Sequence, residues 1–356
     1  MLKKLLSRTA ITAVIILVQI VWIVALLLRL SDALPVMNYV LRILSLVAVL
    51  HVIKNDMDPS YKVSWVLFIA LLPLFGGLMY VLFGNKRPTR FIRDKLNVQL
   101  EETARYYTMR PSAAEEIDDD GARGLFKYLE SYSGYRACRD TKTEYFPVGE
   151  DMFARLIPEL EKAEEFIFLE YFIIAEGNML EKVLAVLERK VREGVKVRLI
   201  YDDVGCVDRL PIHYTKLMEN KGIKCMAFNR FVPFLSLAMN NRDHRKILVI
   251  DGYIGYSGGI NLADEYINEV KRFGYWKDTG VRIEGEAVWS LTSMFLSMWN
   301  YIVHSTEDYS RFMPAQHQKA PFENDGFVQP YGDSPLDHEN VGENIYQVGG
   351  QAVLGR

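Results

Sequence analysis

Long apolar runs fill the first 85 residues of the chain, and no run of comparable length follows them. Residues 10–28 are apolar apart from Gln19, and residues 64–83 form a second strong run around Pro73. About 20 apolar residues suffice to cross a bilayer as a helix. The weaker run at 36–53 carries Arg42 near its centre, at a cost of roughly 2.5–3.5 kcal/mol without a partner. We expect a membrane anchor of two or three hydrophobic helices over residues 1–85.

Basic residues flank this region on both sides. Lys3, Lys4 and Arg8 precede the first run, which we interpret as a retained anchor because it is long for a signal peptide and no cleavage site follows. A second basic cluster at 86–95 predicts a cytoplasmic position for the rest of the chain. Three full spans cannot place both clusters inside, whereas two spans and one shallow segment can, so the topology stays open.

The remaining residues show the patterns of alternating helices and strands. Residues 86–124 are charged and predict a solvated linker. Apolar spacing predicts helices at 151–163, 179–193, 211–221 and 286–302. Strand patterns occur at 143–147, 166–174, 195–201, 223–228, 246–251, 253–257 and 276–284. This alternation predicts an α/β layered domain with a largely buried sheet.

Charge and cysteine content narrow the classes of function. The formal net charge of −3 gives no basic field of the kind that attracts nucleic acid. The three cysteines, Cys138, Cys206 and Cys225, form no C-x-x-C pair, so we expect reduced thiols and neither a disulfide framework nor a cysteine zinc site.

One segment, residues 244–261, concentrates the candidate chemistry. His244 and Lys246 are two residues apart, so both side chains face the same way on a strand. A neutral imidazole can attack phosphorus and hold a covalent intermediate, while a fixed ammonium neutralises the phosphate oxygens. Asp251 could orient a ring nitrogen of the histidine. Gly258, Gly259 and Asn261 form a small-residue turn whose asparagine amide would bind phosphate.

Other polar residues leave alternatives open. Glu170, inside an apolar strand, is either near the site or a buried carboxylate elsewhere. Glu265 either orients the site or caps a helix. Asp202 and Asp203 end a strand and lack a histidine or cysteine cluster, so we interpret them as a cap or turn and not a metal site. Residues 228–234 fit a membrane contact or a loop over the site.

The segment resembles the phospholipase D superfamily, whose motif is His-x-Lys-x4-Asp followed by Gly-(Gly/Ser)-x-Asn. His244, Lys246, Asp251, Gly258 and Asn261 match it, with Gly259 at the variable position. The apolar N-terminus, the Leu-Phe-Gly-Asn-Lys-Arg sequence at 82–87 and Asn-Asn-Arg-Asp before the histidine are similar to bacterial cardiolipin synthases. This resemblance covers about residues 1–345 and implies a phospholipase D-like α/β sandwich with a mixed sheet over 125–320.

The resemblance implies a membrane phosphatidyltransferase. Such enzymes transfer a phosphatidyl group between two phosphatidylglycerol molecules and release glycerol, through a phosphohistidine and without metal or cofactor. His244 would then act as nucleophile or acid/base, Lys246, Asn261, Gly258 and Gly259 would hold phosphate, and Asp251 would support the histidine. The expected partners are phosphatidylglycerol and membrane lipid, with no nucleic acid. The expected location is the bacterial plasma membrane, multi-pass, with the catalytic part on the cytoplasmic face.

The chain departs from the family in carrying one motif where members carry two. Residues 341–346 echo 148–153, so we expect 321–356 to be a connector and the interrupted start of a second unit. Three hypotheses remain: a phosphatidyltransferase, a phospholipase D-like hydrolase or nuclease that uses water, and an inactive lipid-binding fragment. Activity from one motif would require a homodimer that pairs two copies of His244 across a two-fold axis.

Overall fold

The computed structural model describes most of the chain, in two compact units. The described residues are 8–33, 35–55, 59–84, 97–98, 101–106, 111–231, 242–305, 307–313, 326–333, 341–342 and 344–346. Residues 1–89 with 231–241 form one unit, here called the helical unit. Residues 90–230 with 242–356 form the other, called the sheet unit. The predicted domain boundaries at 85, 124 and 320 stay predictions.

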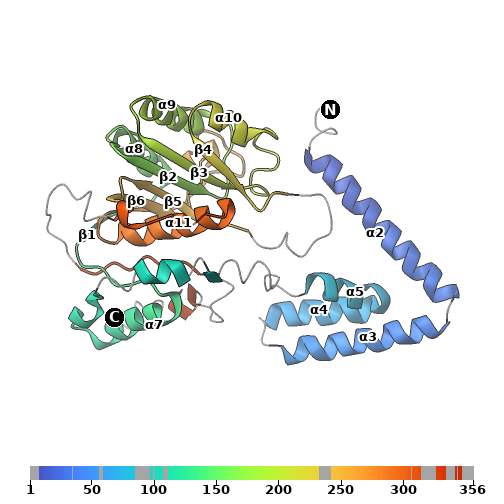
Figure 1. Ribbon diagram of the computed structural model, residues 1–356. Coiled ribbons are helices and arrows are strands. Elements are labelled where there is room, and N and C mark those ends of the chain that lie inside the picture. The colour runs from blue at the N-terminus through green and yellow to red at the C-terminus, as the bar shows by residue number, and fades with distance from the viewer. Residues whose placement is uncertain are drawn as a thin grey trace. The chain divides into compact units, whose positions relative to one another are not determined.

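The helical unit consists of four helices in its described part (Figure 1). They are α2 (Arg8–Ala33), α3 (Pro35–Lys54), α4 (Pro59–Leu71) and α5 (Pro73–Phe83). The predicted run at 64–83 is divided because Pro73 lacks an N–H and begins a new helix after Leu72. Gly76 lets α5 approach α4, since a Cβ there would lie 2.7 Å from the Cα of Ile69. Ala48, Val52, Ile69 and Tyr80 form a small buried core.

The predicted membrane-spanning helices are not supported. Among the helices in the described part of the chain, none is both long enough and apolar enough to cross a bilayer. The basic cluster at 86–95, used to predict topology, lies outside the described residues.

The sheet unit is built on a seven-stranded mixed sheet. Its strands are β1 (Thr141–Phe146), β2 (Phe166–Tyr171), β3 (Lys196–Asp202), β4 (Lys224–Phe228), β5 (Lys246–Ile250), β6 (Ile254–Gly258) and β7 (Gly280–Gly285). The order is β1-β7-β6-β5-β2-β3-β4. β2, β3 and β4 are parallel, whereas β5, β6, β7 and β1 join by antiparallel pairing. The predicted α/β fold with a mixed sheet is confirmed.

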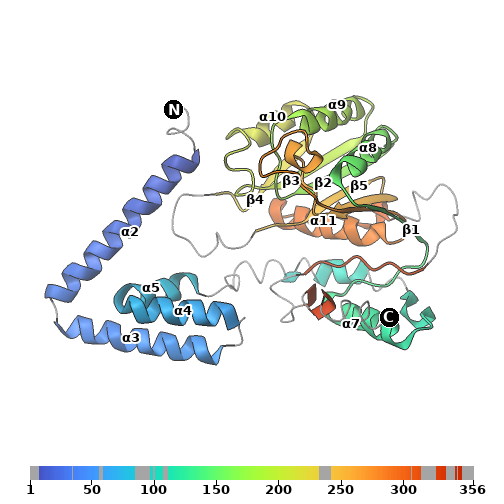
Figure 2. The ribbon, with the colours of Figure 1, turned by 180° about the vertical axis from the view of Figure 1, so that it is seen from behind.

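Helices cover both faces of this sheet (Figures 1 and 2). α8 (Gly149–Leu160), α9 (Asn178–Arg192) and α10 (Tyr214–Asn220) lie on one face, and α11 (Val288–Val303) lies on the other. Alternate residues of β2 enter two cores because strand side chains point to opposite faces. Ile167 and Leu169 join the core under α8 and α9, while Phe166 and Phe168 join the core under α11.

Further described elements of the sheet unit lie before β1 or in connections along the chain. The short helix η1 (Ala113–Glu116) lies in the predicted linker, and α7 (Asp120–Ser133) begins in it and extends beyond residue 124. Asp119 accepts a hydrogen bond from the amide of Ala122 and so caps α7. The short helices η3 (Asp264–Ile267) and η4 (Ser310–Phe312) lie in later connections. Of the echoed segment at 341–346, residues 341–342 and 344–346 are helical, and Val341 is buried.

Candidate active site

The motif begins where the parallel strands end. β5 runs antiparallel to β2, and its first residue, Lys246, pairs with Tyr171 at the end of β2. β6 returns to the same edge, where Gly258 pairs with Gly280 at the start of β7. Segments after β2, β3 and β6 therefore meet the segment before β5 at one edge, here called the site edge. Open α/β sheets bind ligands at the carboxyl ends of their parallel strands.

His244 and Lys246 lie together at the site edge. The Nζ atom of Lys246 is 3.2 Å from Nδ1 of His244 and donates a 2.6 Å hydrogen bond to the carbonyl oxygen of His244. His244 is exposed, whereas Lys246 is 6% exposed. The arrangement presents an imidazole to incoming ligands with an ammonium directly behind it.

Phe172 contacts both of these side chains. Its ring centroid is 4.7 Å from that of His244, and the Nζ atom of Lys246 lies 5.4 Å from the Phe172 centroid. An ammonium over an aromatic face is attracted by the ring quadrupole. The sequence-based analysis missed Phe172, although its position directly after the buried strand β2 was a usable signal.

The segment 172–174 is held in place by the two neighbouring loops. The amide of Ile173 donates to Oδ1 of Asn261 at 2.9 Å, and the amide of Ile174 donates to Sγ of Cys206 at 3.1 Å. Gly205 packs against the carbonyl oxygen of Phe172 so closely that a Cβ atom would collide with it. These contacts hold the backbone of the segment that carries the Phe172 ring.

Burial lowers the pKa of both motif side chains. Burial brings the pKa of Lys246 down to about 8, with the carboxylates of Asp243 and Asp278 acting in the opposite direction. The pKa of His244 is lowered by burial and by the charge of Lys246. Near neutral pH this favours an unprotonated imidazole beside an ammonium that is still mostly charged. That protonation pattern suits nucleophilic attack on a phosphodiester.

Asp251 lies at the other end of β5, and the prediction that it orients a ring nitrogen of His244 is wrong. Its carboxylate accepts three backbone amides at 2.8 Å, from Glu164, Glu165 and Phe166. The four residues between Lys246 and Asp251 form the body of the strand, which separates their Cα atoms by roughly 16 Å at about 3.3 Å per residue. Asp251 fixes the entry into β2.

The turn at 258–261 adopts a conformation that needs its glycines. Gly258 has φ +146°, and a Cβ there would collide with the carbonyl oxygen of Thr279. Asn261 is 2% exposed, and its Nδ2 donates to the hydroxyl of Tyr266 at 2.8 Å. With its Oδ1 on Ile173, Asn261 links the turn to the Phe172 segment. Contact of Asn261, Gly258 or Gly259 with phosphate stays a prediction.

Asp278 is a second side chain that the sequence-based analysis missed. Gly259 lies so close to its carboxylate that a Cβ would collide with Oδ1 of Asp278. The negative charge of Asp278 acts to raise the pKa of Lys246. An acidic residue two positions before β7 was the available signal, because β7 begins at the site edge.

Glu170 lies behind the motif, on the opposite face of the strands. Ile247 and Phe168 belong to the α11 core, whereas Leu248 and Leu169 belong to the other. Glu170 is fully buried and forms a 2.5 Å ion pair with Nη2 of Arg245, the residue between the two motif side chains. Burial holds the pKa of Glu170 well above its usual value. Glu170 thus supports Arg245 and does not contact His244.

Asp202 and Asp203 end β3 at the site edge, and the interpretation of Asp202 as a turn cap is confirmed. Oδ1 of Asp202 accepts the amides of Val204 and Gly205 at 2.9 and 3.0 Å. Its Oδ2 accepts the amide of Asp243 at 3.0 Å and so also holds the segment before His244. Within the described residues, no cluster of histidine, cysteine and acidic side chains could hold a metal ion.

Glu265 joins two loops and does not contact His244. Its Oε1 accepts hydrogen bonds from Arg209 at 2.6 Å and from Arg272 at 3.5 Å. Burial alone would raise the pKa of Glu265, but the hydrogen bond and charge of Arg209 hold it below its usual value. Of the predicted membrane or lid segment at 228–234, residues 232–234 lie outside the described part.

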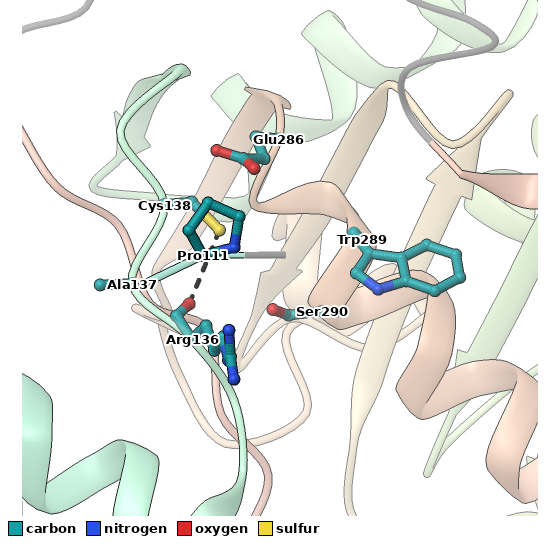
Figure 3. A pocket seen from close by; sticks show the side chains of 7 residues that line it. All are labelled: Pro111, Arg136, Ala137, Cys138, Glu286, Trp289 and Ser290. Atoms are coloured by element: carbon teal, nitrogen blue, oxygen red, sulfur yellow. Dashed lines mark hydrogen bonds between the residues drawn. The ribbon is translucent and has the colours of Figure 1, made fainter. Parts of the chain in front are cut away.

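A small open pocket lies elsewhere on the sheet unit (Figure 3). It is lined by Pro111, Arg136, Ala137, Cys138, Glu286, Trp289 and Ser290. Glu286 directly follows β7, whose last residue, Gly285, lies at the end of the sheet opposite the site edge. The sulfur of Cys138 is 3.6 Å from the carbonyl oxygen of Arg136. This pocket is therefore not part of the motif site.

Known proteins resemble both units of the chain. Residues 156–299 match the family model "Cardiolipin synthase, PLD-like domain", and residues 43–85 match "Phospholipase_D-nuclease N-terminal". An uncharacterized protein of Streptococcus mutans is 42% identical over 302 residues, which are 84% of this chain and 65% of that protein. A cardiolipin synthase of Listeria monocytogenes is 32% identical over 282 residues, 76% of this chain and 58% of the relative.

Further known proteins match this chain over different shares of its length. A cardiolipin synthase of a Geobacillus species is 34% identical over 255 residues, 71% of this chain and 51% of the relative. The chain thus spans between about half and two thirds of the length of these curated relatives. The nuclease Nuc of Salmonella typhimurium matches with 16% identity and a TM-score of 0.34, covering 47% of this chain and 96% of that chain.

A phosphatidylserine synthase of Haemophilus influenzae matches with 14% identity and a TM-score of 0.38, covering 64% of this chain and 48% of that chain. These two structural scores are too low to carry an argument. The family model and the curated relatives do carry one, because the matched range includes β2 to β7 and the whole of the 244–261 segment. The chain belongs to the phospholipase D superfamily and carries its cardiolipin synthase-type domain.

Proposed function

We propose that this chain provides the catalytic half-site of a phosphatidyltransferase that makes cardiolipin from two phosphatidylglycerol molecules. The single observation that carries the proposal is the pair at the site edge. An exposed imidazole lies 3.2 Å from the ammonium of Lys246, and both contact one aromatic ring. The curated cardiolipin synthases that resemble this chain supply the substrate class.

The proposed reaction has two displacements at one phosphorus atom. In the first, the unprotonated ring nitrogen of His244 forms a bond to phosphorus, and the bond from phosphorus to the glycerol oxygen breaks. Glycerol leaves with that electron pair and takes a proton from a general acid. In the second, the hydroxyl of another phosphatidylglycerol gives its proton to the same group, attacks phosphorus and releases His244. Two phosphatidylglycerol molecules thus become cardiolipin and glycerol.

Lys246 has the electrostatic role in this scheme. Its ammonium would neutralise the non-bridging oxygens, where negative charge grows in the transition state. Because its pKa is about 8, it can hold this charge at neutral pH. Phe172 would hold the ammonium and the imidazole in their relative positions. Asn261 would contribute indirectly, by accepting a hydrogen bond from the amide of Ile173 and so positioning the Phe172 segment.

The proposed reaction also needs a general acid on the leaving-group side of phosphorus, opposite the attacking ring of His244. Among the described residues, no second histidine and no carboxylate is hydrogen-bonded to the ring of His244. We propose that His244 of a second copy fills this role across a two-fold axis. A homodimer would bring two such half-sites together.

Membrane association is the remaining part of the proposal. α2 and α3 carry large apolar side chains that are strongly exposed, among them Leu17, Trp22, Val36 and Ile43 at 60%, 65%, 74% and 62%. Apolar patches of this kind mark contacts with a membrane or a protein. We propose that the helical unit attaches the chain to the bacterial plasma membrane, where its lipid substrate lies, with the sheet unit on the cytoplasmic face.

Product analysis tests this function directly. The purified full chain is incubated with phosphatidylglycerol in detergent, and cardiolipin and glycerol are followed with His244→Ala beside it. We expect both products from the wild-type chain and neither from the variant. Equal cardiolipin from both proteins would exclude His244 as the nucleophile. Phosphatidic acid in place of cardiolipin would show that water is the acceptor and the chain is a hydrolase.

A further inference from the structure

Two loops at the site edge expose large apolar side chains. One loop, residues 203–213, follows β3, and the other, residues 268–277, leads from η3 towards β7. The exposed side chains are Ile212 at 73%, Val270 at 51%, Phe273 at 76% and Tyr275 at 63%. We call these four residues the lip. Removing apolar side chains from water is favourable, so a group of exposed ones marks a surface that binds a membrane or a protein.

The exposure of Phe273 is fixed by its loop. The side chain of Asn268 bonds to both ends of the Trp276 backbone, accepting from its amide at 2.7 Å and donating to its carbonyl at 2.9 Å. Trp276 in turn packs on Tyr266, with ring centroids 5.3 Å apart. The closed loop holds Phe273 outward at its tip, 6.1 Å from the ring of Trp276.

One carboxylate ties the two loops together. Arg209 belongs to the first loop and Arg272 to the second, and both donate to Oε1 of Glu265, at 2.6 and 3.5 Å. Glu265 is mostly buried, with a side chain 11% exposed. The shared acceptor places Arg209 and Arg272 side by side, so the two loops that carry the lip are neighbours.

The exposed charged side chains of the second loop are Glu269, Lys271, Arg272 and Lys277, so cations outnumber the one anion. Asp264, in η3 before the loop, accepts the amides of Asn178 and Met179, and the exposed Glu269 pairs with Lys182 at 3.8 Å. Lys271 and Lys277 are exposed, and neither has an ion pair with any residue in the described part of the chain. The lip therefore offers exposed aromatic and aliphatic groups flanked by two cations.

We propose that the lip is an interfacial surface that seats the site edge on an anionic bilayer. Phe273 and Ile212 would enter the headgroup region, while Lys271 and Lys277 would contact lipid phosphates. Amphipathic surfaces of this kind bind through buried apolar area together with attraction to anionic lipid. The proposal rests on the proposed phospholipid substrate, and it would let a lipid headgroup reach His244 without leaving the membrane.

A fluorescent reporter on the full chain tests this surface. An environment-sensitive dye is attached to Phe273→Cys in a Cys138→Ser background, and the protein is bound to vesicles of phosphatidylcholine with or without phosphatidylglycerol. The matched control is Tyr145→Cys, on the edge strand β1, because Tyr145 is similarly exposed, at 64% against 76% for Phe273. We expect the emission of the dye at 273 to shift to the blue, and spin-labelled lipid to quench it, only when phosphatidylglycerol is present. The dye at 145 should stay in water.

Charge variants measure the electrostatic part. The variants Lys271→Gln and Lys277→Gln are each bound to vesicles with the dye at position 273. Each should reduce the ratio of lipid-quenched to unquenched dye about fivefold, as expected for the loss of one lysine near an anionic surface. A dye at 273 that stays in water while the chain is vesicle-bound would overturn the proposal. Shielding that grows with protein concentration without vesicles would also overturn it, in favour of a second copy.

The outcome is independent of catalysis. His244→Ala should keep the full dye response at 273, because the lip does not include the motif. A normal response with no cardiolipin formed would contradict the proposed function and leave the lip intact. Cardiolipin formed without any response at 273 would contradict the lip alone.

Discussion

At the start of β5 the ammonium of Lys246 lies beside an exposed imidazole, whereas at the end of β5 the carboxylate of Asp251 accepts three backbone amides. Both residues belong to one sequence motif. The first end presents groups that a ligand can reach, whereas at the second end backbone amides of the protein already occupy the carboxylate of Asp251. A conventional motif can therefore combine chemistry and folding, and only the contacts tell which residue serves which purpose.

Removing the cation at the first end should have the largest effect. Lys246→Ala deletes the charge that would stabilise the phosphate transition state, a type of loss that costs on the order of 10²–10³ in rate. The thermal midpoint should change little, because Lys246 has no ion pair with a described carboxylate. Steady-state kinetics with phosphatidylglycerol measure the first effect, and Lys246→Arg is the charge-retaining control. A variant with normal turnover would remove Lys246 from the mechanism.

The second end should respond in stability. Asp251→Ala leaves three amides without their charged acceptor, and hydrogen bonds to charged groups contribute about 1.5–3 kcal/mol each. Asp251 also has φ +51°, which alanine adopts at a cost of about 1–2 kcal/mol. We expect at least about 3 kcal/mol of lost unfolding free energy in denaturant titration. An unchanged midpoint would show that the amides find other partners.

The pH profile separates the two motif side chains at the first end. Lys246 must be protonated to act, so kcat/KM should fall about tenfold per pH unit above its pKa of about 8. The attacking His244 must be unprotonated, and its lowered pKa puts the acidic limb below the usual range for a histidine, while the His244 that acts as general acid must keep its proton. An alkaline limb above pH 10 would mean that Lys246 is not buried as described. The Lys246→Arg variant should lose the alkaline limb near pH 8.

The smallest expected effect comes from Phe172. Phe172→Leu opens space beside Lys246, and because burial is the main cause of its low pKa, the alkaline limb should move upward by less than about one unit. Phe172→Tyr keeps the ring and should leave the limb in place. A downward shift with leucine would show that attraction to the ring, and not burial, dominates the pKa of Lys246.

The sequence predicted local features well because they depend on spacing. The alternation along β5 correctly placed His244 and Lys246 on one side, and the alternating patterns predicted the α/β fold, whereas the mixed sheet followed from the resemblance to phospholipase D. The partner of Asp251 could not be predicted, since the amides of residues 164–166 lie about 85 positions earlier and reach it only when β2 pairs with β5. The contact of Phe172 with Lys246 depends on the same pairing.

For the first 85 residues, the prediction rested on apolar composition and not on spacing. Apolar composition predicted membrane-spanning helices, yet Pro73 divides the run at 64–83 between α4 and α5, helices of 13 and 11 residues. Hydropathy averages over a window and does not register where a helix must end. Glu170 was similarly ambiguous, because β2 is buried on both faces and its pattern does not say which face meets the motif.

The most direct test compares the two ends of β5 in one assay. Turnover of phosphatidylglycerol is measured for Asp251→Asn and His244→Ala at a temperature where both are fully folded, normalised to folded protein. We predict that Asp251→Asn retains turnover close to wild type, while His244→Ala forms no cardiolipin. A folded Asp251→Asn that is as inactive as His244→Ala would contradict the assignment of chemistry to the first end alone.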